Sequence, residues 1–534
     1  MSTNALRARF ANRAAPATPG VWTPSFNPWL IAASVMLATF MEVLDTSVAN
    51  VALPHIAGNL SATTEESTWV LTSYLVSNAI ILPATNWLGR YFGRKRFLML
   101  CIIIFTLASA LCGAATSLGM LIFARILQGA GGGALQPIAQ AVLMESFPPE
   151  KRGSAMAVFG MGVVVAPIIG PTLGGWITDN YSWRWIFYIN IPIGILAVFM
   201  ANMFIEDPPY IRNQRPGRID RLGFALMAIG LGTLQLVLDK GQEEDWFNSS
   251  LITFAAVFAG VMLVAFVIWE LSTKEPIVDL RVLKNRNFTV GTGIMTILGI
   301  VLYGTIALLP LFLQTLLGYP ALQSGLAVSP RGFGSILSMI VVGRLVSKID
   351  GRYLVLFGFI VLAYATYRFA DINLTITSLS ITWPNIISGF AMGFIFVPLT
   401  TMAMGTLPNE QMGNASGVFN LMRNTGGSIG IAAMTTMLSR GSQIHQAALI
   451  HNINPYNPEV QQRVQQLGHV LPGGGGGSGG QQAYGMIYGM LARQAMLLSY
   501  IDNFRMLAFL CILCLPAVFL FKRVRAKKGA VAMH

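Results

Sequence analysis

Two carboxylates stand in an apolar stretch near the start of the chain. The segment TFMEVLDTSVANVALP, residues 39–54, lies in an apolar run that begins near Trp29, and it contains Glu42 and Asp45. The two acids are three residues apart, so a helix presents both on one face. About 20 apolar residues span the hydrocarbon of a bilayer, and a carboxylate at that depth costs about 2.5–3.5 kcal/mol. Such charges indicate either a function or a buried partner.

The chemistry open to these acids is proton exchange. Surroundings of low dielectric favour the neutral form of a carboxyl group, which lets it load and release a proton. We predict that Asp45 and Glu42 are proton-coupling residues, and we favour Asp45 because Glu42 can lie at the helix edge. The alternative is a structural pair that bonds to nearby polar groups such as Thr46 and Asn50.

A polar stripe marks a second apolar stretch, residues 118–144. Its members, which fall within about 60° of one line on a helix, are Arg125, Gln128, Gly132, Gln136 and Gln140. We predict that this stripe faces water or a cavity and that Arg125 approaches Asp45 as the third proton-coupling residue. The alternative is a structural arginine that bonds to backbone carbonyls.

The composition is that of a membrane protein. Hydrophobic residues make up 54% of the 534 residues and charged residues 11%, against about 25% charged residues in soluble proteins. The four cysteines all lie in apolar runs, which does not fit a disulfide or zinc pattern, so we predict no metal and no cofactor. We predict no signal peptide before Trp29.

Recurring apolar runs predict an all-α polytopic membrane protein, because long runs without alternation are helices and helices satisfy their backbone in lipid. The fourteen predicted spans are 29–54, 69–88, 97–115, 118–144, 154–177, 185–204, 221–238, 250–271, 288–317, 321–346, 353–370, 380–404, 414–438 and 504–521. With a cytoplasmic N-terminus, every second loop is rich in Lys and Arg. The predicted termini are therefore cytoplasmic, and basic loops beside anionic lipid explain the net charge of +13 without a nucleic-acid partner.

An internal repeat divides the chain. The string FPPEKRGSAMAVF around Pro148 matches LPNEQMGNASGVF around Pro408, and Gly129, Gly133 and Gly170 match Gly389, Gly393 and Gly430, each 260 residues later. The prediction is an N-terminal tail (1–28), a six-helix half (29–204), a linker with two extra helices (205–287), a second six-helix half (288–521) and a basic tail (522–534). Parallel halves are a transporter architecture, with the site at the membrane midplane between them.

The site between such halves would be a large cavity with apolar walls and a few polar groups. The residues predicted to line it are Gln128, Gln136, Tyr303, Phe312, Gln314, Asn420 and Arg423. Arg423, like Arg331, is an intramembrane cation beside a polar or glycine-rich turn. Each fits contact with an anionic group of a substrate equally well as a role in capping and packing.

Three other segments stand out. Gly162, Ala166, Gly170 and Gly174 recur every four residues, which permits close helix packing and fits a contact that rocks. The loop NWLGRYFGRKR, residues 86–96, is explained by topology alone or by a latch on helix ends. In the predicted outer loop 439–503, the run LPGGGGGSGGQQ predicts a flexible linker between two moderately helical stretches, which either dock a partner or lie on the surface.

Several strings carry a family resemblance: LDTSVANVALP, WVLTSYLVSNAI, RILQGAGGG, GPTLGG, WRWIFYINIPIG and LPLFLQTLLGYPALQSGLAVSPRG. Over nearly the whole chain from Trp29 the sequence resembles the major facilitator superfamily, and more narrowly the fourteen-span drug/proton antiporters of the EmrB type. The resemblance implies that Asp45 is the first-span acid of proton coupling and that Arg125 is the arginine of the RxxQG motif. It also implies conformational motifs, made of Gly170, Pro171, Gly174 and Gly175 in the fifth span and of Gly93, Arg94 and Lys95 in the inner loop.

The chain departs from the family pattern at the inner loop, where Asn86 and Arg90 replace a glycine and an acid. The usual latch between an aspartate and an arginine therefore cannot form there in its family form. Ala157 and Ala166 replace glycines of the fifth-span motif. EmrB-type pumps resemble parts of a tripartite system, which implies a periplasmic adaptor and an outer-membrane channel as partners.

The leading hypothesis is a proton-coupled antiporter of the inner membrane that exports lipophilic or amphipathic compounds by alternating access. Such multidrug efflux gives antibiotic resistance, and the proton gradient supplies its energy. The first alternative is a dedicated exporter of one metabolite, lipid or siderophore. A membrane enzyme would need a cluster of nucleophile, base or metal ligands, which the sequence does not offer. The intramembrane acid and the polar stripe count against a receptor or scaffold.

Overall fold

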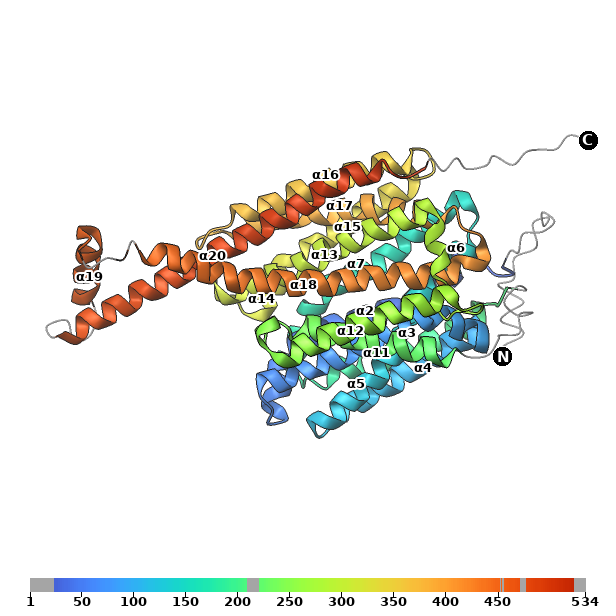
Figure 1. The fold of residues 1–534 in the computed structure, drawn as a ribbon, viewed down its shortest axis with the longest axis horizontal. Coiled ribbons are helices and arrows are strands. Elements are labelled where there is room, and N and C mark those ends of the chain that lie inside the picture. The colour runs from blue at the N-terminus through green and yellow to red at the C-terminus, as the bar shows by residue number, and fades with distance from the viewer. Residues whose placement is uncertain (1–23, 209–219, 452, 454–455, 471–476, 523–534) are drawn as a thin grey trace, which may run out of the picture.

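The protein is a bundle of long helices that lie side by side in the computed structural model (Figure 1). The structure describes residues 24–208, 220–451, 453, 456–470 and 477–522. The helices before the middle of the chain are α2 (Pro28–Asn59), α3 (Thr64–Phe92), α4 (Arg94–Gly113), α5 (Leu118–Gly132), α6 (Leu135–Ser146), α7 (Arg152–Asn180), α8 (Trp185–Tyr188), α9 (Asn190–Phe204), α11 (Arg221–Lys240) and α12 (Ser250–Ser272). Those after it are α13 (Arg286–Thr315), α14 (Ala321–Val328), α15 (Pro330–Leu345), α16 (Gly351–Arg368), α17 (Ser378–Met404), α18 (Met412–Ile450), α19 (Pro458–Val470) and α20 (Gly477–Val518).

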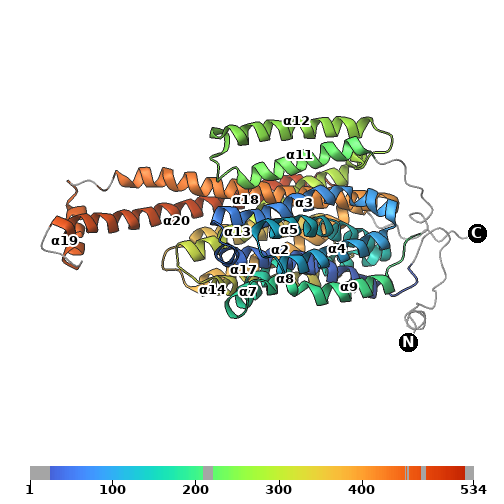
Figure 2. The same ribbon diagram turned by 90° about the horizontal axis from the view of Figure 1, so that it is seen from below.

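Two groups of helices meet along the middle of the bundle. Helices α2 to α9 form the first half and α13 to α20 the second, and they meet chiefly where α7 packs on α15 and where α3 and α6 pack on α18. Helices α11 and α12 lie on the outside, where α11 packs against α3 and α18 (Figure 2). We call the end of the bundle at which α2 begins and α20 ends the terminal end (Figure 1). The opposite end is the far end.

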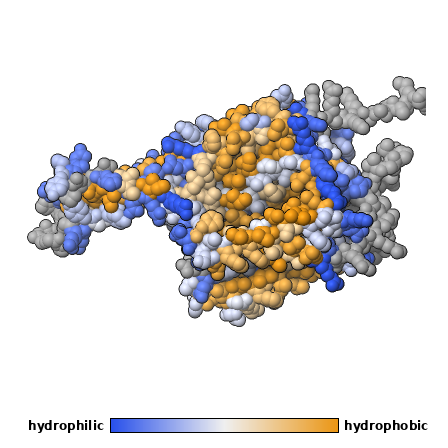
Figure 3. Space-filling model, viewed as in Figure 1, coloured by the Kyte–Doolittle hydropathy of each residue, from blue (hydrophilic) through white to orange (hydrophobic). Residues whose placement is uncertain are grey.

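The outer surface is apolar in a wide band. Hydrophobic residues cover the middle of the visible face, and hydrophilic residues gather at the terminal end and at the far end (Figure 3). Helix α12 illustrates the cause, because Phe254 is 71% exposed and nearly all of its neighbours along the helix are apolar. In a membrane protein such side chains meet lipid instead of water. The all-α membrane fold expected from the sequence is therefore confirmed.

Twelve helical segments of the described residues are long and apolar enough to cross a membrane, and some of them, such as Leu118–Ser146, join two consecutive helices. Helices α3 and α18, which contain the predicted spans 69–88 and 414–438, are not among the twelve. Both are long, but they carry polar side chains such as Asn78 and Asn420 that are buried against other helices. Burial in protein removes the need for an apolar side chain, so hydropathy is a weak signal there. The number fourteen stays a prediction.

One predicted span is broken. The stretch 118–144 forms two helices, α5 and α6, that are interrupted at Gly133 and Ala134. Gly133 packs so closely against α3 that a Cβ atom there would overlap the carbonyl oxygen of Asn78. Irregular backbone at membrane depth is tolerated where protein surrounds it, and both break residues are buried.

The predicted outer loop 439–503 is mostly helix. Helix α18 continues to Ile450, and α20 runs without a break from Gly477 to Val518, so the two form an arm that projects from the far end with α19 at its tip (Figures 1 and 2). His445 of α18 lies 2.7 Å from Asp502 of α20. The flexible-linker prediction is wrong for residues 477–482, which form the first turns of α20, because the helix that follows extends back through them. Residues 471–476 lie outside the described part, as do most of both predicted tails.

The glycines of the repeat mark equivalent helix contacts in the two halves. A Cβ atom at Gly129 of α5 would overlap the carbonyl oxygen of Tyr74 on α3. In the second half, a Cβ atom at Gly389 of α17 would overlap the carbonyl oxygen of Arg331 on α15. Membrane helices associate largely through such close backbone packing. Tyr74 and Arg331 therefore occupy matching places in the two halves.

We expect Gly389→Ala to destabilise the protein, because its new methyl group meets backbone that no side-chain movement can displace. Overpacking of this kind costs about 1–3 kcal/mol. Gly260→Ala on α12 is the matched control: nothing lies within 4 Å of the added methyl group there, and alanine favours the helix by about 1 kcal/mol. Thermal unfolding of both variants in detergent measures the effect, and equal midpoints would contradict it.

Candidate functional site

Asp45 lies at the centre of the first half, where α2 places it 2% exposed. Its Oδ2 accepts a hydrogen bond from Nη1 of Arg125 at 2.7 Å. Its Oδ1 accepts from Nε2 of Gln128 at 2.9 Å and from Nδ2 of Asn190 at 2.7 Å. Helices α2, α5 and α9 thus meet at one carboxylate. The ion pair that the polar stripe predicts is present, and both of its side chains are buried.

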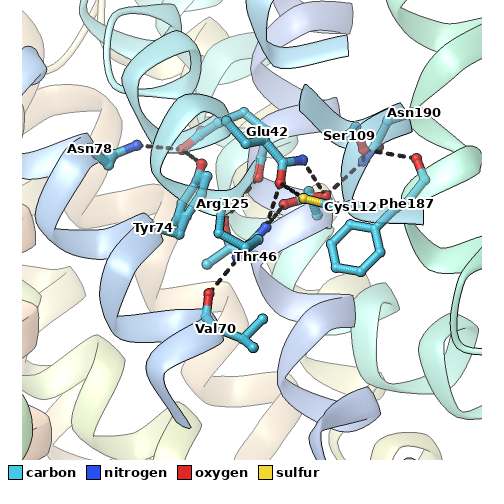
Figure 4. Close-up of polar contacts among 12 residues, drawn as sticks. Glu42, Thr46, Val70, Tyr74, Asn78, Ser109, Cys112, Arg125, Phe187 and Asn190 are labelled. Atoms are coloured by element: carbon cyan, nitrogen blue, oxygen red, sulfur yellow. Dashed lines mark hydrogen bonds and ion pairs between the residues drawn. The ribbon is translucent and has the colours of Figure 1, made fainter. Parts of the chain in front are cut away.

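Nε and Nη1 of Arg125 make hydrogen bonds within the first half, whereas Nη2 is buried without a hydrogen-bond partner among the described residues (Figure 4). Its Nε donates to the carbonyl oxygen of Val70 at 3.0 Å, and Nη1 also donates to Gln128. The guanidinium lies 4.3 Å from the ring centroid of Tyr74 and 5.7 Å from that of Phe187, which adds cation–π attraction. Removal of one partner from a buried ion pair leaves an uncompensated charge, so the arginine and the aspartate act as a unit.

Glu42 occupies a different cage, one helical turn from Asp45 and 4% exposed. Its Oε1 accepts from the hydroxyl of Tyr74 at 3.1 Å and from Nδ2 of Asn78 at 3.3 Å. Its Oε2 accepts from Nε2 of Gln136 at 2.7 Å. All three donors are neutral groups. Of the two acids, Asp45 therefore has a direct cationic partner and Glu42 has amide and hydroxyl donors.

The C-terminal part of the polar stripe, Gln136 and Gln140 on α6, contacts the second half. The Oε1 atom of Gln136 accepts a hydrogen bond from Nη2 of Arg423 on α18. One turn further on α6, Oε1 of Gln140 accepts from Ser416 at 2.9 Å and from Asn420 at 2.6 Å. The stripe thus faces buried side chains of α2 and α18, and the prediction that it faces water or a cavity is wrong for this structure. The contact between the two halves buries the stripe, and the hydropathy of the sequence gives no information about that contact.

The remaining predicted cavity residues do not form one wall. Phe312 is completely buried and stacks edge-on against Tyr500 at 5.4 Å, so it belongs to the core of the second half. Tyr303 is half-buried against Gly427, and Gln314 is exposed near the far end. A pocket of about 660 Å³ does open at the far end between α16 and α17, where Trp383 is among its lining residues. None of the predicted cavity residues lines it.

The loop between α3 and α4 forms a compact joint at the terminal end. Gly93 has a φ of +84°, a left-handed conformation that favours glycine. Arg94 pairs with Glu145 of α6, and the backbone N–H of Lys95 donates to Oδ1 of Asp207 at 2.8 Å. The sequence pointed to the three loop residues but to neither acid. Glu145, the residue directly after the predicted span 118–144, was the available signal.

The fifth-span motif on α7 lies against α2. Cβ atoms at Gly170 and Gly174 would meet Ser47 and Val48, and Gly175 faces Leu322 of the second half. Pro171 has no N–H to donate to the carbonyl of residue 167, and the hydroxyl of Ser47 donates to that oxygen at 3.0 Å. The motif thus joins the acid-bearing helix to the contact between the halves.

Sequence reasoning missed three members of the cages, namely Tyr74, Asn78 and Asn190. All three stand in strings that carried the resemblance, WVLTSYLVSNAI and WRWIFYINIPIG. A tyrosine or asparagine inside an apolar span was the signal that could have found them, because buried polar groups need hydrogen-bond partners.

Comparison with known proteins identifies the family. Residues 35–431 match the model of the Major Facilitator Superfamily. The chain is 41% identical over 490 residues to the "Multidrug export protein EmrB" of Escherichia coli (strain K12), covering 92% of this chain and 94% of that protein. It is 39% identical to the "Fatty acid resistance protein FarB" of Neisseria gonorrhoeae, covering 92% and 95%.

A solved structure shares the fold. The crystal structure of the human organic anion transporter MFSD10 matches with a TM-score of 0.59 at 12% identity, covering 92% of this chain and 99% of that one. At this identity the likeness concerns the fold alone. With the family match over most of the chain and the two buried acids between its helices, the protein belongs to the major facilitator superfamily, in the family of EmrB-type drug exporters.

Proposed function

We propose that this protein is a proton-coupled antiporter that exports lipophilic or amphipathic compounds by alternating access. The observation that carries the proposal is the pair of acids on α2, both buried and each held in its own set of donors. Carboxylates at membrane depth are energetically unfavourable, and proton exchange is a function that would explain their presence there. The proton gradient is the energy source in this proposal, and no cofactor takes part.

In this mechanism Asp45, Glu42 and Arg125 are the proton-coupling set. Nη1 of Arg125 donates to the carboxylate of Asp45 at 2.7 Å. A change in the position of α2 relative to α5 would weaken that contact and let the acid take up a proton. Helix α2 also packs closely on α7 through Gly170 and Gly174. Movement of the halves and the charge of the acids are therefore linked through one helix.

We propose that the terminal end faces the cytoplasm and that the protein lies in the inner membrane. Basic loops and the positive-inside rule support this orientation. At that end the halves touch: Nη2 of Arg152 donates to Asn409 at 3.3 Å, and the hydroxyl of Ser154 donates to the carbonyl of Gly343 at 3.0 Å. Under this orientation the structure is closed toward the cytoplasm.

We also propose that the arm of α18, α19 and α20 contacts a periplasmic adaptor that leads to an outer-membrane channel. The arm projects away from the bundle at the far end (Figures 1 and 2), and Tyr456 at its tip is 91% exposed. Tyrosine is enriched at protein interfaces. Co-purification of an adaptor with the full chain, but not with a Tyr456→Ser variant, tests the contact.

The experiment for the proposed function measures protons released on addition of substrate to proteoliposomes with an internal pH dye. The panel holds lipophilic cations, neutral amphiphiles and a fatty acid, and protein-free liposomes are the control. We expect proton movement with several unrelated compounds. A response to one class only would favour a dedicated exporter. The relative named for fatty acid resistance is the reason to include a fatty acid in the panel. Movement of labelled compound without protons would contradict antiport.

A further inference from the structure

Three side chains in a row connect Glu42, the acid without a cation in direct contact, to the second half. Glu42 on α2 accepts from the amide of Gln136 on α6, and the same amide accepts from Arg423 on α18. All three residues are at least nine-tenths buried. One amide therefore contacts a titratable group with its nitrogen and a cation of the other half with its oxygen.

We propose that Gln136 couples the proton on Glu42 to the contact between the halves, by holding Arg423 while Glu42 is ionised and releasing it when Glu42 is neutral. This inference rests on the proposed function, since it takes Glu42 to exchange a proton. Gln136 acts here as a positioning residue. It neither carries the proton nor binds the exported compound.

The chemistry follows from donors and acceptors. An ionised carboxylate only accepts hydrogen bonds, whereas a protonated one also donates through its O–H. Oε2 of Glu42 has one donor, Gln136, while Oε1 has two, so a proton on Oε2 displaces fewer hydrogen bonds. With that proton in place, two donors face each other. The amide of Gln136 relieves the conflict by turning its oxygen toward Glu42.

That rotation removes the acceptor from Arg423. The nitrogen of the turned amide then faces the guanidinium, and both groups are donors. The other contacts of the guanidinium go from Nε and Nη2 to the adjacent Asn424, at 3.3 and 3.2 Å, and Nη1 has no hydrogen-bond partner among the described residues. A buried cation left with only the oxygen of Asn424 as acceptor is costly. Separation of the halves, which admits water to Arg423, becomes favourable.

Other charges near Glu42 do not replace this link. Asp45 lies on the same helix, Tyr74 approaches from α3 with Arg125 over its ring, and Arg423 faces it from α18. From α7 and α9, which also pack on α2, no described titratable group is among those that act on Glu42. Gln140 gives a natural comparison, because it joins α6 to α18 one turn away through Ser416 and Asn420, which are both neutral.

The test measures the distance between the halves as the pH changes. Nitroxide labels on Arg96→Cys and Ser347→Cys report it by pulsed electron resonance in lipid nanodiscs; both positions are exposed on opposite halves near the terminal end, and the four native cysteines are buried. In the unmodified background we expect the ratio of short to long distances to fall about tenfold from pH 8 to pH 5, the change that one hydrogen bond of a charged group supplies.

The matched variants are Gln136→Met and Gln140→Met, which remove an amide with little change in volume. We expect less than about a twofold response to pH in Gln136→Met and an unreduced tenfold response in Gln140→Met. Glu42→Gln should give the long distance at every pH, and it supplies a second reading if Gln136→Met does not fold. An unchanged response in Gln136→Met, or equal losses in both methionine variants, would overturn the proposal.

The proton-release assay on the same samples separates this inference from the proposed function. If the distance depends on Gln136 but no exported compound moves protons, the coupling stands and the antiport proposal fails. If protons move and the distance ignores Gln136, antiport stands and the coupling fails.

Discussion

Replacing Asp45 with asparagine is expected to abolish proton-driven export. Asparagine keeps the shape of the side chain and an oxygen that can accept from Arg125, but it carries no exchangeable charge. Substrate-driven proton release in proteoliposomes should fall to the level of protein-free liposomes. The amount of protein in the membrane, measured on the same samples, should remain near that of wild type.

The matched control is Asp179→Asn. Asp179 is an acid on the neighbouring helix α7, but its side chain is 55% exposed and its partner, His55, lies 3.9 Å away. The same chemical change there should leave proton release within the error of the assay. Full transport by Asp45→Asn would show that this acid is structural.

Removal of the arginine is expected to have the largest effect on stability. Arg125→Ala leaves the buried Asp45 with only the amides of Gln128 and Asn190 as partners. Loss of one member of a buried pair costs about 3–5 kcal/mol. We expect a strongly lowered unfolding midpoint in detergent, followed by fluorescence-detected size exclusion, together with loss of export.

A double variant separates charge from packing. Asp45→Asn combined with Arg125→Ala removes the charge that Arg125→Ala leaves behind and keeps the same loss of packing, so it should recover part of the stability that Arg125→Ala loses, yet it should not recover proton release. Arg368→Ala is the control for loss of a guanidinium, because its pair with Asp371 is about half exposed and such pairs contribute about 0–1 kcal/mol. If the double variant is as unstable as Arg125→Ala, the buried charge is not the cause.

Local sequence was enough to place much of this site. An acid inside an apolar run, an arginine on one stripe of another run and a repeat of 260 residues predicted the membrane fold and the pairing of Asp45 with Arg125. These features could be read because charge at membrane depth is costly and therefore rare. A rare charge has few candidate partners, so the sequence itself narrows the choice.

Neutral polar groups were harder to place. Gln136 was assigned to a cavity wall, and Glu42 was predicted to take part in proton coupling from a place that could be the helix edge. In the structure Gln136 donates to Glu42 and accepts from Arg423. A glutamine costs less to bury than a charge, so its presence in a span indicates no particular partner. Which helix it meets depends on the docking of α18 against α6.

The sequence by itself thus determined that helices cross a membrane, that they come in two related halves, and that charge is buried in the first. Only the tertiary structure decided which neutral donors surround Glu42, where α5 and α6 separate, and that α18 and α20 continue as an arm. Whether a segment crosses the membrane depends on its own apolar length and charge, because these set the free energy of moving it from water into lipid. Hydrogen bonds between segments depend on distances that arise when the helices pack together.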